Sequence, residues 1–507
     1  MNRRRFLHRA SAGFLAASLP RPIPVRGQSR PLGAFGTQKA GGSDGRPNIL
    51  LAISDDQSWL HTGIGGDPVV KTPTFDRVAR EGVLFTHAFC ASPSCTPSRG
   101  AILTGQAPWR LKENGNLWST LRKEFPVYPD LLEAAGYHVG CTGKGWGPGQ
   151  IPPGGRSRNP AGPPCKDFEQ FLETVPKGSP FCFWFGSTDP HRPYEAGSGV
   201  RSGKRIENVQ VPPFLPDAPE VRSDILDYGF EIERFDRQVG ELIRLLEQTG
   251  RLDNTLVMIT SDNGMPFPRA KANLYDYGTR LPLAIRWPIG AKGGRVVDDF
   301  VGFTDFAPTF LEAAGLKPPP EMTGKSLLSL LTSDKVGRID PARDKVFTGR
   351  ERHAWCRQGG LGYPCRAVRT ERFLYIRNFK PDRWPAGDPE GYGDIDDGPT
   401  KRYMMANRES KRASHLFRLA FDKRPTEELY DLSKDPAQMQ NVANLSEYAD
   451  ALRTMRAELN RWMTRIQDPR ATEQGDAFDR YPYYGTIRPA TPSRVRKRPM
   501  GQSAQNR

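Results

Sequence analysis

The sequence predicts an α/β fold, in which a mixed, mostly parallel sheet lies between two layers of helices. Short apolar runs alternate with helical segments along most of the chain, which is the pattern of such a fold. Several of these runs end in acidic or amide residues, at the strand ends where α/β proteins bind ligands. After about residue 360 the pattern alternates instead, which indicates a smaller C-terminal α+β domain with an antiparallel sheet.

The expected elements of the large domain follow one another along the chain. Continuous apolar runs are typical of strands buried on both faces. We expect strands in NILLAIS (48–54), the second half of LLEAAGYHVGCTGKG (131–145), PFCFWFG (180–186), TLVMITS (255–261) and LPLAIRWP (281–288). We expect helices in TPTFDRVAREG (72–82), the first half of 131–145, the long segment 223–250 and TDFAPTFLEAAG (304–315). The long helix should begin at a serine cap and end at a glycine.

These elements give five segments. Residues 1–30 read as a signal peptide, 31–46 as a Gly-rich linker, 47–360 as the large domain, 361–470 as the smaller domain and 471–507 as a basic, flexible tail. In the smaller domain, CRAVRTERFLYIRNF (365–379) alternates like an antiparallel strand pair, and a helix is expected near 446–467.

The positive charge is concentrated at the two ends of the chain. The net charge is +16, of which residues 1–30 carry seven charges and residues 494–507 carry five. The body is therefore only modestly positive, which suits an anionic substrate and does not indicate nucleic-acid binding.

The N-terminus resembles a twin-arginine signal, although an ordinary basic tail is the alternative. Arg3 and Arg4 precede Phe6 and Leu7, and the apolar run ASAGFLAASL that follows is too short to span a bilayer. We therefore expect a bacterial protein that the twin-arginine machinery exports to the periplasm or beyond, and not an integral membrane protein. The seven cysteines do not indicate a disulfide scaffold in a chain of this length. Cys356 and Cys365 are the best candidate pair, and Cys182 should be buried and inert.

Polar residues at three strand ends predict one shared site. Asp55-Asp56, His191 and Asp262-Asn263 each follow an expected strand, and such ends meet at one edge of the sheet. The aspartates and the asparagine form an all-oxygen set, which suits Ca²⁺ or Mg²⁺. Each pair taken alone could instead be a helix cap or an Asx-turn.

The stretch CTPSRGAILTG (95–105) adds a candidate nucleophile. If a helix starts at Pro97, Cys95 and Arg99 face one point near its N-terminus, where anions bind well. Cys95 could instead be a small buried hydrophobe.

Cys95-Thr96-Pro97-Ser98-Arg99 with Leu103-Thr104-Gly105 resembles the signature of the sulfatases, a family of the alkaline phosphatase superfamily. The resemblance runs from about Asn48 to Ala443, and SDNGMPFP, NLYDYGT, TDPHRPY and ELYDLSKDP are most similar to heparan N-sulfatases (sulfamidases). It implies an alkaline-phosphatase-like large domain and a sulfated-glycan substrate.

The resemblance also implies the roles of the site residues. A formylglycine-generating enzyme would recognise Cys95, Pro97 and Arg99 before export and would oxidise Cys95 to formylglycine. The hydrate of formylglycine has two hydroxyls, one to attack sulfur and one to release sulfate. The implied ligands of Ca²⁺, with Mg²⁺ as the alternative ion, are Asp55, Asp56, Asp262, Asn263 and residue 95. Arg99 would support the aldehyde, Lys144 and Lys271 would hold sulfate oxygens, and His191 would protonate the leaving atom.

The sequence departs from the family at two positions. Lys271 stands where sulfamidases have an arginine, and Trp146 stands where the family usually has a histidine that handles the second hydroxyl. A tryptophan cannot accept a proton, so we consider His61 and His138 as substitutes. Arg350, Arg352 and His353 could bind a substrate anion or form a solvated charge run, and His191 and Lys271 could instead serve packing and solvation.

The leading hypothesis is an exported, formylglycine- and calcium-dependent sulfatase whose preferred target is N-sulfoglucosamine. The alternatives are an O-sulfatase acting on another polysaccharide, a phosphate-ester or phosphonate hydrolase of the same superfamily, and a non-catalytic polyanion-binding protein. The sequence leaves open the scissile bond, the glycan and the oligomeric state.

Overall fold

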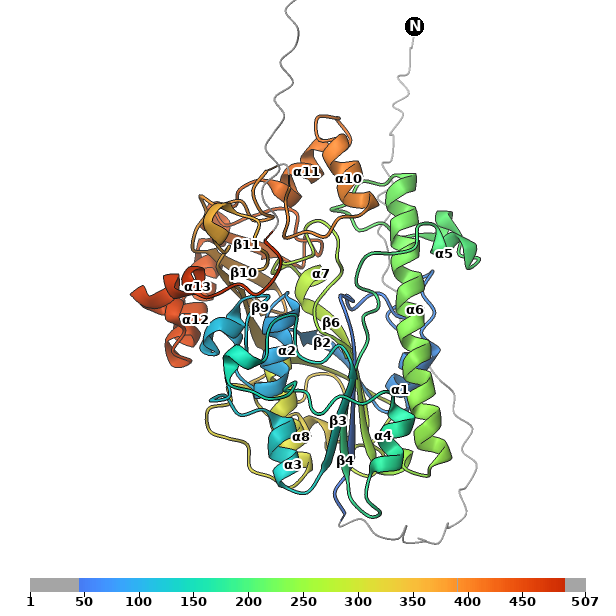
Figure 1. Ribbon diagram of the computed structural model, residues 1–507. Helices are drawn as coiled ribbons and strands as arrows, with labels where there is room; N and C mark the ends of the chain where they lie inside the picture. The colour runs from blue at the N-terminus through green and yellow to red at the C-terminus, as the bar shows by residue number, and fades with distance from the viewer. Residues whose placement is uncertain (1–44, 390, 488–507) are drawn as a thin grey trace, which may run out of the picture. The chain divides into compact units, whose positions relative to one another are not determined.

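A seven-stranded sheet forms the centre of the large part of the protein (Figure 1). The structure is a computed structural model and describes residues 45–389 and 391–487. The strands are β1 (Asn48–Ser54), β2 (Val83–Phe89), β3 (His138–Gly143), β4 (Phe181–Gly186), β5 (Thr255–Ser261), β6 (Arg280–Arg286) and β7 (Arg295–Gly302). Their order is β3-β4-β1-β5-β6-β2-β7, and only β6 within this sheet runs antiparallel to its neighbours. The predicted mixed, mostly parallel sheet is confirmed.

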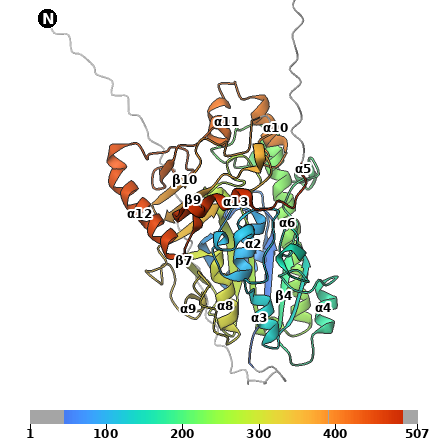
Figure 2. The ribbon, with the colours of Figure 1, turned by 60° about the vertical axis from the view of Figure 1, so that its left-hand side comes forward.

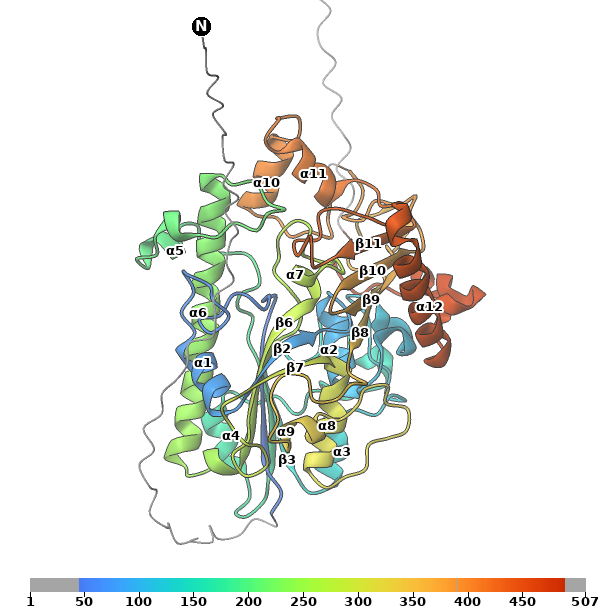
Figure 3. The same cartoon turned by 180° about the vertical axis from the view of Figure 1, so that it is seen from behind.

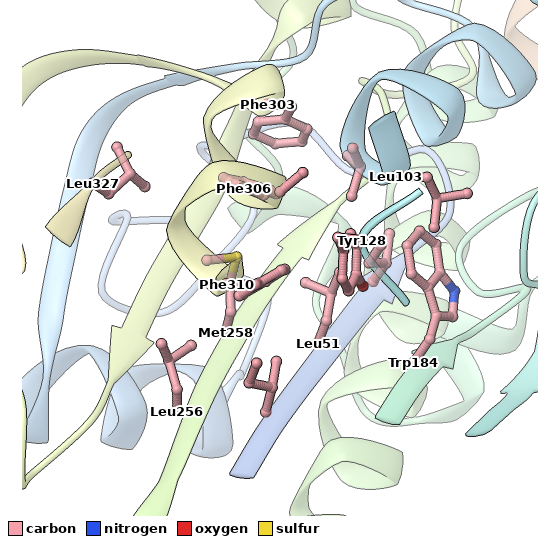
Figure 4. Close-up of a cluster of buried hydrophobic side chains, with 14 of the residues drawn as sticks. Leu51, Leu103, Tyr128, Trp184, Leu256, Met258, Phe303, Phe306, Phe310 and Leu327 are labelled. Carbon is pink, nitrogen blue, oxygen red and sulfur yellow. The ribbon is translucent and has the colours of Figure 1, made fainter. Parts of the chain in front are cut away.

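The central strands are apolar on both faces because helices cover both faces. Every residue of β1 and β5 is buried, and Leu50 of β1 pairs with Phe183 of β4 and Val257 of β5. Leu51 and Met258 point toward Phe306 and Phe310 on one face (Figure 4). Burial of this kind is the main favourable contribution to folding.

Two layers of helices enclose the sheet (Figures 1 and 3). On one face lie α2 (Cys95–Thr104), α3 (Tyr128–Ala134) and α8 (Phe306–Ala313), which share a hydrophobic cluster with the strands. On the other face lie α1 (Pro73–Glu81), α4 (Phe168–Thr174) and α6 (Pro219–Gln248). The predicted serine cap of α6 is wrong, because the helix begins four residues earlier with Pro219 in its first turn, where a missing N–H costs nothing. Likewise α2 begins at Cys95 and not at Pro97.

A four-stranded antiparallel sheet lies in the C-terminal part (Figures 2 and 3). Its strands are β8 (Lys345–Arg350), β9 (Cys365–Thr370), β10 (Phe373–Asn378) and β11 (Glu427–Asp431), so the sheet starts before the expected boundary at residue 360. The predicted strand pair within 365–379 is confirmed. Helix α12 (Ala449–Arg465) packs on one face, and Leu274 and Tyr275 from the β5–β6 connection pack on the other. This second contact fixes the loop that carries Lys271.

The other described α-helices are short, and several 3₁₀ helices lie in the connections. These α-helices are α5 (Ser198–Arg201), α7 (Asp276–Thr279), α9 (Leu328–Leu331), α10 (Pro399–Ala406), α11 (Ser414–Phe421) and α13 (Ala477–Arg480). Phe478 of α13 is buried beside Trp109 and Ile466, so packed structure continues past residue 470, where the flexible tail was expected to begin. The proposed signal peptide, most of the linker and the end of the tail lie outside the described residues.

All seven cysteines lie within the described residues and are free. The predicted Cys356–Cys365 pair is therefore not formed. Cys365 is buried against Leu274 on one face of the second sheet, whereas Cys356 lies against Gly387 and Gly393 in the loop after β10. Cys182 is buried in β4, as expected. Among the described helices, none is both long and apolar enough to cross a membrane.

Candidate active site

Four neighbouring strands end at the predicted site. β3, β4, β1 and β5 are consecutive and parallel in the sheet, so their carboxyl ends lie along one edge. Lys144 follows β3, His191 lies just beyond β4, Asp55 and Asp56 follow β1, and Asp262 and Asn263 follow β5. The structure thus brings together the residues that the sequence placed at separate strand ends.

A buried group of oxygen and sulfur atoms lies at this edge. Ligand atoms of Asp55, Asp56, Cys95 and Asp262 all lie within 4.8 Å of one another. Asn263 Nδ2 donates to Asp262 Oδ1 at 2.8 Å and to Cys95 Sγ at 3.6 Å. Its Oδ1 is buried and accepts no hydrogen bond from the described residues. Three buried carboxylates and an unpaired amide oxygen fit a hard cation such as Ca²⁺ or Mg²⁺.

The backbone of Asp56 adopts a conformation that few non-glycine residues use. Its φ is 74°, in the left-handed region. The Asp56 N–H donates to Asp262 Oδ1 at 3.1 Å, and its carbonyl accepts from the Tyr228 hydroxyl at 3.0 Å. Strained residues persist where surrounding contacts determine them, and they concentrate at functional sites.

Helix α2 carries Cys95 into the group as its first residue. Cys95 Sγ donates to Asp55 Oδ1 at 3.6 Å. One turn later, the fully buried Arg99 donates from Nε to Asp262 Oδ2 at 2.7 Å and from Nη1 to the carbonyls of Lys144 and Gly145 at 2.6 and 3.0 Å. Arg99 therefore fixes α2 to two strand ends, and its Nη2 is buried with no hydrogen-bond acceptor among the described residues.

Two lysines stand against the carboxylates. Lys144 Nζ lies 2.5 Å from Asp55 Oδ2, and Lys271 Nζ lies 2.6 and 2.5 Å from the two carboxylate oxygens of Asp56. Burial opposes the charge of each lysine, but the nearby carboxylates outweigh it, and the pKa of Lys144 and of Lys271 is raised. Both ammonium groups stay charged at neutral pH, as the binding of an anion requires.

The acidic and thiol groups respond differently to burial. Burial raises the pKa of Asp56 to about 6 although Lys271 and His191 oppose it. At Asp55 burial acts in the same direction, but Lys144, His191 and Arg99 together lower the pKa of that carboxyl. Burial also raises the pKa of the Cys95 thiol, which therefore stays protonated and is a poor nucleophile as it stands.

His191 lies at the opening of the site. Its side chain is 35% exposed, and Nε2 is 3.9 Å from Asp56 Oδ2. Nδ1 is 2.6 Å from the Arg192 carbonyl, so Nδ1 carries the proton of that hydrogen bond and Nε2 faces the carboxylates. The Arg192 guanidinium binds both oxygens of Asp224 at 2.7 and 2.8 Å, which fixes the backbone beside the histidine.

Residues 47–148 and 165–316 match the family model described as sulfatase. The chain belongs to the sulfatase family. Residues 269–391 also match the model described as N-sulphoglucosamine sulphohydrolase, C-terminal. The predicted family is confirmed, the protein is a sulfatase enzyme, and the alternative of a non-catalytic binding protein is set aside.

The relatives of this sulfatase include enzymes named for different substrates. A human N-sulphoglucosamine sulphohydrolase is 28% identical over 83% of this chain and 91% of its own length. An ulvan-active sulfatase of Formosa agariphila is 28% identical over 83% of this chain and 76% of its own length. A human N-acetylgalactosamine-6-sulfatase is 26% identical over 59% of this chain and 68% of its own length.

Solved structures share the fold of this sulfatase. One of them is a protein solved with its substrate D-glucosamine-2-N,6-O-disulfate. It has a TM-score of 0.62 at 21% identity, and the match covers 85% of this chain and 100% of that one. The phosphonate monoester hydrolase of Agrobacterium radiobacter has a TM-score of 0.62 at 19% identity, covering 84% and 97% of the two chains. These likenesses support the alkaline-phosphatase-like fold and nothing finer.

The two histidines considered as substitutes at Trp146 are held elsewhere in this sulfatase. His138 starts β3, at the opposite end of the strand from Lys144, and bonds Thr174 at 3.0 Å. His61 Nδ1 lies 2.8 Å from Asp67 Oδ2. Trp146 itself is a core residue whose Nε1 donates to Asn114 Oδ1 at 2.8 Å. The proposal that His138 replaces the usual histidine is therefore wrong, and the ring of His61 is paired with Asp67.

The side chains of Arg350, Arg352 and His353 are buried, so the prediction of a solvated run of charges is wrong. Arg350 pairs with Asp394, Arg352 donates to backbone carbonyls near residue 481, and His353 Nδ1 lies 2.8 Å from Ser94 Oγ. The contact of His353 with Ser94 holds this segment against the start of α2, and Asp394 neutralises Arg350.

Sequence reasoning missed Asp396. Its carboxylate lies 3.5 Å from Lys271 Nζ and within 4.8 Å of the ligand atoms of Asp56 and His191. The only signal was the acidic run DIDDG in the smaller domain, which no spacing rule connects to the strand ends.

Proposed function

We propose that this sulfatase is an exported, formylglycine- and calcium-dependent enzyme that removes sulfate from N-sulfoglucosamine units of sulfated glycans. The observation that carries the proposal is the position of Cys95, whose Sγ is 3.6 Å from both Asp55 Oδ1 and Asn263 Nδ2 in a buried carboxylate group. Conversion by a formylglycine-generating enzyme also explains why a protonated thiol occupies the place of a nucleophile. Export by the twin-arginine machinery rests on residues 1–30 alone.

A bound metal ion and a modified residue 95 would supply the central chemistry. Bound Ca²⁺ would act as a Lewis acid on a sulfate oxygen, and the formylglycine hydrate would offer a hydroxyl to sulfur. Asp55, Asp56, Asp262 and Asn263 are the residues that would hold the ion, with residue 95 beside it.

The protein's own residues have separate roles in this proposal. Lys144 and Lys271 place two positive charges where the sulfate oxygens gain negative charge. His191 presents Nε2 at the opening, where it can donate a proton to the leaving atom. Arg99 holds α2 against Asp262 and so positions residue 95. Water is excluded because these groups, apart from His191, are buried or nearly so.

Two observations favour the sulfamate over a sulfate ester. The C-terminal match covers residues 269–391, which include Lys271 and most of the second sheet. The human N-sulphoglucosamine sulphohydrolase is also matched over 91% of its own length. The second candidate is an O-sulfatase, favoured by the ulvan-active relative at the same 28% identity.

The test has two parts. Mass spectrometry of the purified protein should find formylglycine at position 95, and sulfate release should be measured on N-sulfoglucosamine, 6-O-sulfated glucosamine and an aryl sulfate. Cys95→Ala should remove all three activities, and Cys95→Ser should not turn over repeatedly, because one hydroxyl can accept sulfate but cannot expel it. Rapid O-desulfation without N-desulfation would support the second candidate, an O-sulfatase. A fully active enzyme with an unmodified Cys95 would contradict the proposed chemistry.

A further inference from the structure

A carboxylate from the C-terminal part stands at the opening of the active site. Asp396 lies in the connection between β10 and α10, and its side chain is 29% exposed. Its Oδ2 is buried, lies 3.5 Å from Lys271 Nζ and accepts no hydrogen bond from the described residues. Asp396 therefore brings a partly exposed carboxylate to the site, and one of its two oxygens lacks a hydrogen-bond donor among the described residues.

The loop that carries Asp396 is anchored on both sides. Two residues earlier, Asp394 pairs with Arg350 and Arg357 and accepts from the Ala354 N–H at 2.8 Å. Four residues later, Thr400 donates from N and Oγ1 to Asp224 Oδ2 at 3.1 and 2.6 Å.

The second anchor is shared with His191. Asp224 also binds the guanidinium of Arg192, the neighbour of His191. Gly398 packs so closely on that guanidinium that a Cβ would lie 2.5 Å from Nη1. The positions of Asp396 and His191 are therefore set by one ion pair, as a preorganised site requires.

Asp396 does not indicate a second metal site. Asp56, His191 and Asp396 are close enough to share an ion. However, the ammonium of Lys271 already contacts Asp56 and lies beside Asp396, so the protein supplies its own cation there. Burial alone would raise the pKa of Asp396, but Lys271, His191 and His353 lower it, and the carboxylate is ionised.

An ionised carboxylate at this place discriminates between leaving groups. It accepts hydrogen bonds and repels electron pairs. The nitrogen of a sulfamate carries a hydrogen that it can donate, whereas the bridging oxygen of a sulfate ester carries none and turns a lone pair toward the carboxylate.

We propose that Asp396 is a specificity-determining residue, which accepts a hydrogen bond from the leaving nitrogen and thereby favours sulfamates over sulfate esters. The inference rests on the proposed sulfatase function. Sulfur forms a bond to the attacking hydroxyl oxygen and loses its bond to nitrogen, which keeps the electron pair and takes a proton from Nε2 of His191, with both ring nitrogens of the histidine protonated beforehand. The second hydroxyl of the hydrate would then lose its proton and expel sulfate by breaking its carbon–oxygen bond, and water would restore the hydrate, so that the net reaction is addition of water across the sulfur–nitrogen bond. Asp396 holds the N–H throughout and then faces the ammonium that the amine becomes on protonation by solvent.

The experiment compares Asp396→Asn with Asp397→Asn in the full-length enzyme, after formylglycine at position 95 has been quantified in each. Asp397 is the matched control, because it is exposed and pairs only loosely with Arg402, at 3.4 Å. Asp396→Asn should lower kcat/KM for N-sulfoglucosamine by about 10- to 100-fold, the range for one hydrogen bond to a charged group. The values for 6-O-sulfated glucosamine and an aryl sulfate should change less than about threefold, as should all values for Asp397→Asn.

Three results would overturn the inference. An equal loss on all three substrates would mean a general electrostatic or structural role, and an unchanged value for N-sulfoglucosamine would mean no role. In both cases an active wild-type enzyme would leave the proposed function standing. A wild-type enzyme that cleaves only O-sulfates would overturn the proposed substrate and this inference together.

Discussion

Lys271 Nζ lies 2.6 and 2.5 Å from the two carboxylate oxygens of Asp56, although the residues are 215 positions apart. The contact depends on the C-terminal part of the chain. Leu274 and Tyr275, just after Lys271, are buried against the second sheet, and the Tyr275 hydroxyl donates to Glu428 at 2.7 Å. The smaller sheet therefore holds a lysine of the proposed active site in place.

Removal of this lysine should damage both activity and stability. Lys271→Met leaves the buried Asp56 without its ion-pair partner, a change that typically costs about 3–5 kcal/mol of unfolding free energy. Chemical denaturation should show that loss, and kcat/KM should fall by about 100-fold or more because a sulfate oxygen loses its cation. Lys271→Arg should retain much more activity. Lys292→Met, which breaks an exposed pair with Asp334, is the control and should cost less than about 1 kcal/mol. Equal effects of the two methionine variants would contradict the role of Lys271.

Calcium should stabilise the folded protein. An ion that binds only the folded state adds about 2.7 kcal/mol when its concentration is 100 times its Kd. Thermal unfolding of wild type should shift upward with Ca²⁺, and chelation should remove both the shift and the activity. Asp262→Asn should reduce the shift, whereas Asp253→Asn, at an exposed carboxylate, should keep it. Identical Tm values in chelator and in Ca²⁺ would exclude this metal site.

His191 should matter most when the leaving group needs a proton. An amine cannot depart as its anion, whereas an aryl sulfate releases a stable phenolate unaided. General acid catalysis is worth about 10²–10⁴-fold, so His191→Ala should slow N-sulfoglucosamine hydrolysis by that factor and aryl sulfate hydrolysis far less. His138→Ala, at the other end of β3, should leave both rates unchanged. The same loss on both substrates would show that His191 is not the acid.

His353 should make the protein acid-sensitive. Burial lowers the pKa of His353 to about 3 in the folded state, whereas the unfolded value is 6.5. The positive charges of Lys271 and Arg350 act in the same direction as burial, and the carboxylate of Asp394 acts against it. Below pH 6.5 the unfolded chain binds a proton that the folded chain does not, so stability is present above that pH and is lost as the pH falls toward 3. The slope from this group is at most about 1.4 kcal/mol per pH unit.

The check is urea denaturation at two pH values, one on each side of this histidine's unfolded pKa. His353→Gln should lose less stability between them than wild type does, while His415→Gln, on the exposed side of α11, should behave like wild type. Equal losses for wild type and His353→Gln would show that this histidine does not set the acid limit.

Local sequence pattern was enough to predict several parts of this protein. Apolar runs of strand length predicted β1, β3, β4, β5 and β6, because a strand buried on both faces admits few polar residues. Acidic residues directly after β1 and β5 predicted where the site lies, because parallel strands end along one edge. The Cys95–Arg99 motif identified the family because its residues are contiguous in the chain.

Which distant groups meet at that edge depends on how the whole chain packs. Asp396 reaches Lys271 through anchors at Asp394 and Thr400, and neither anchor has a partner close in sequence. Trp146 faces the core and not the site because Asn114 accepts its N–H. Such positions follow from packing between elements far apart in the chain, where each contact depends on all the others, and no local spacing records them.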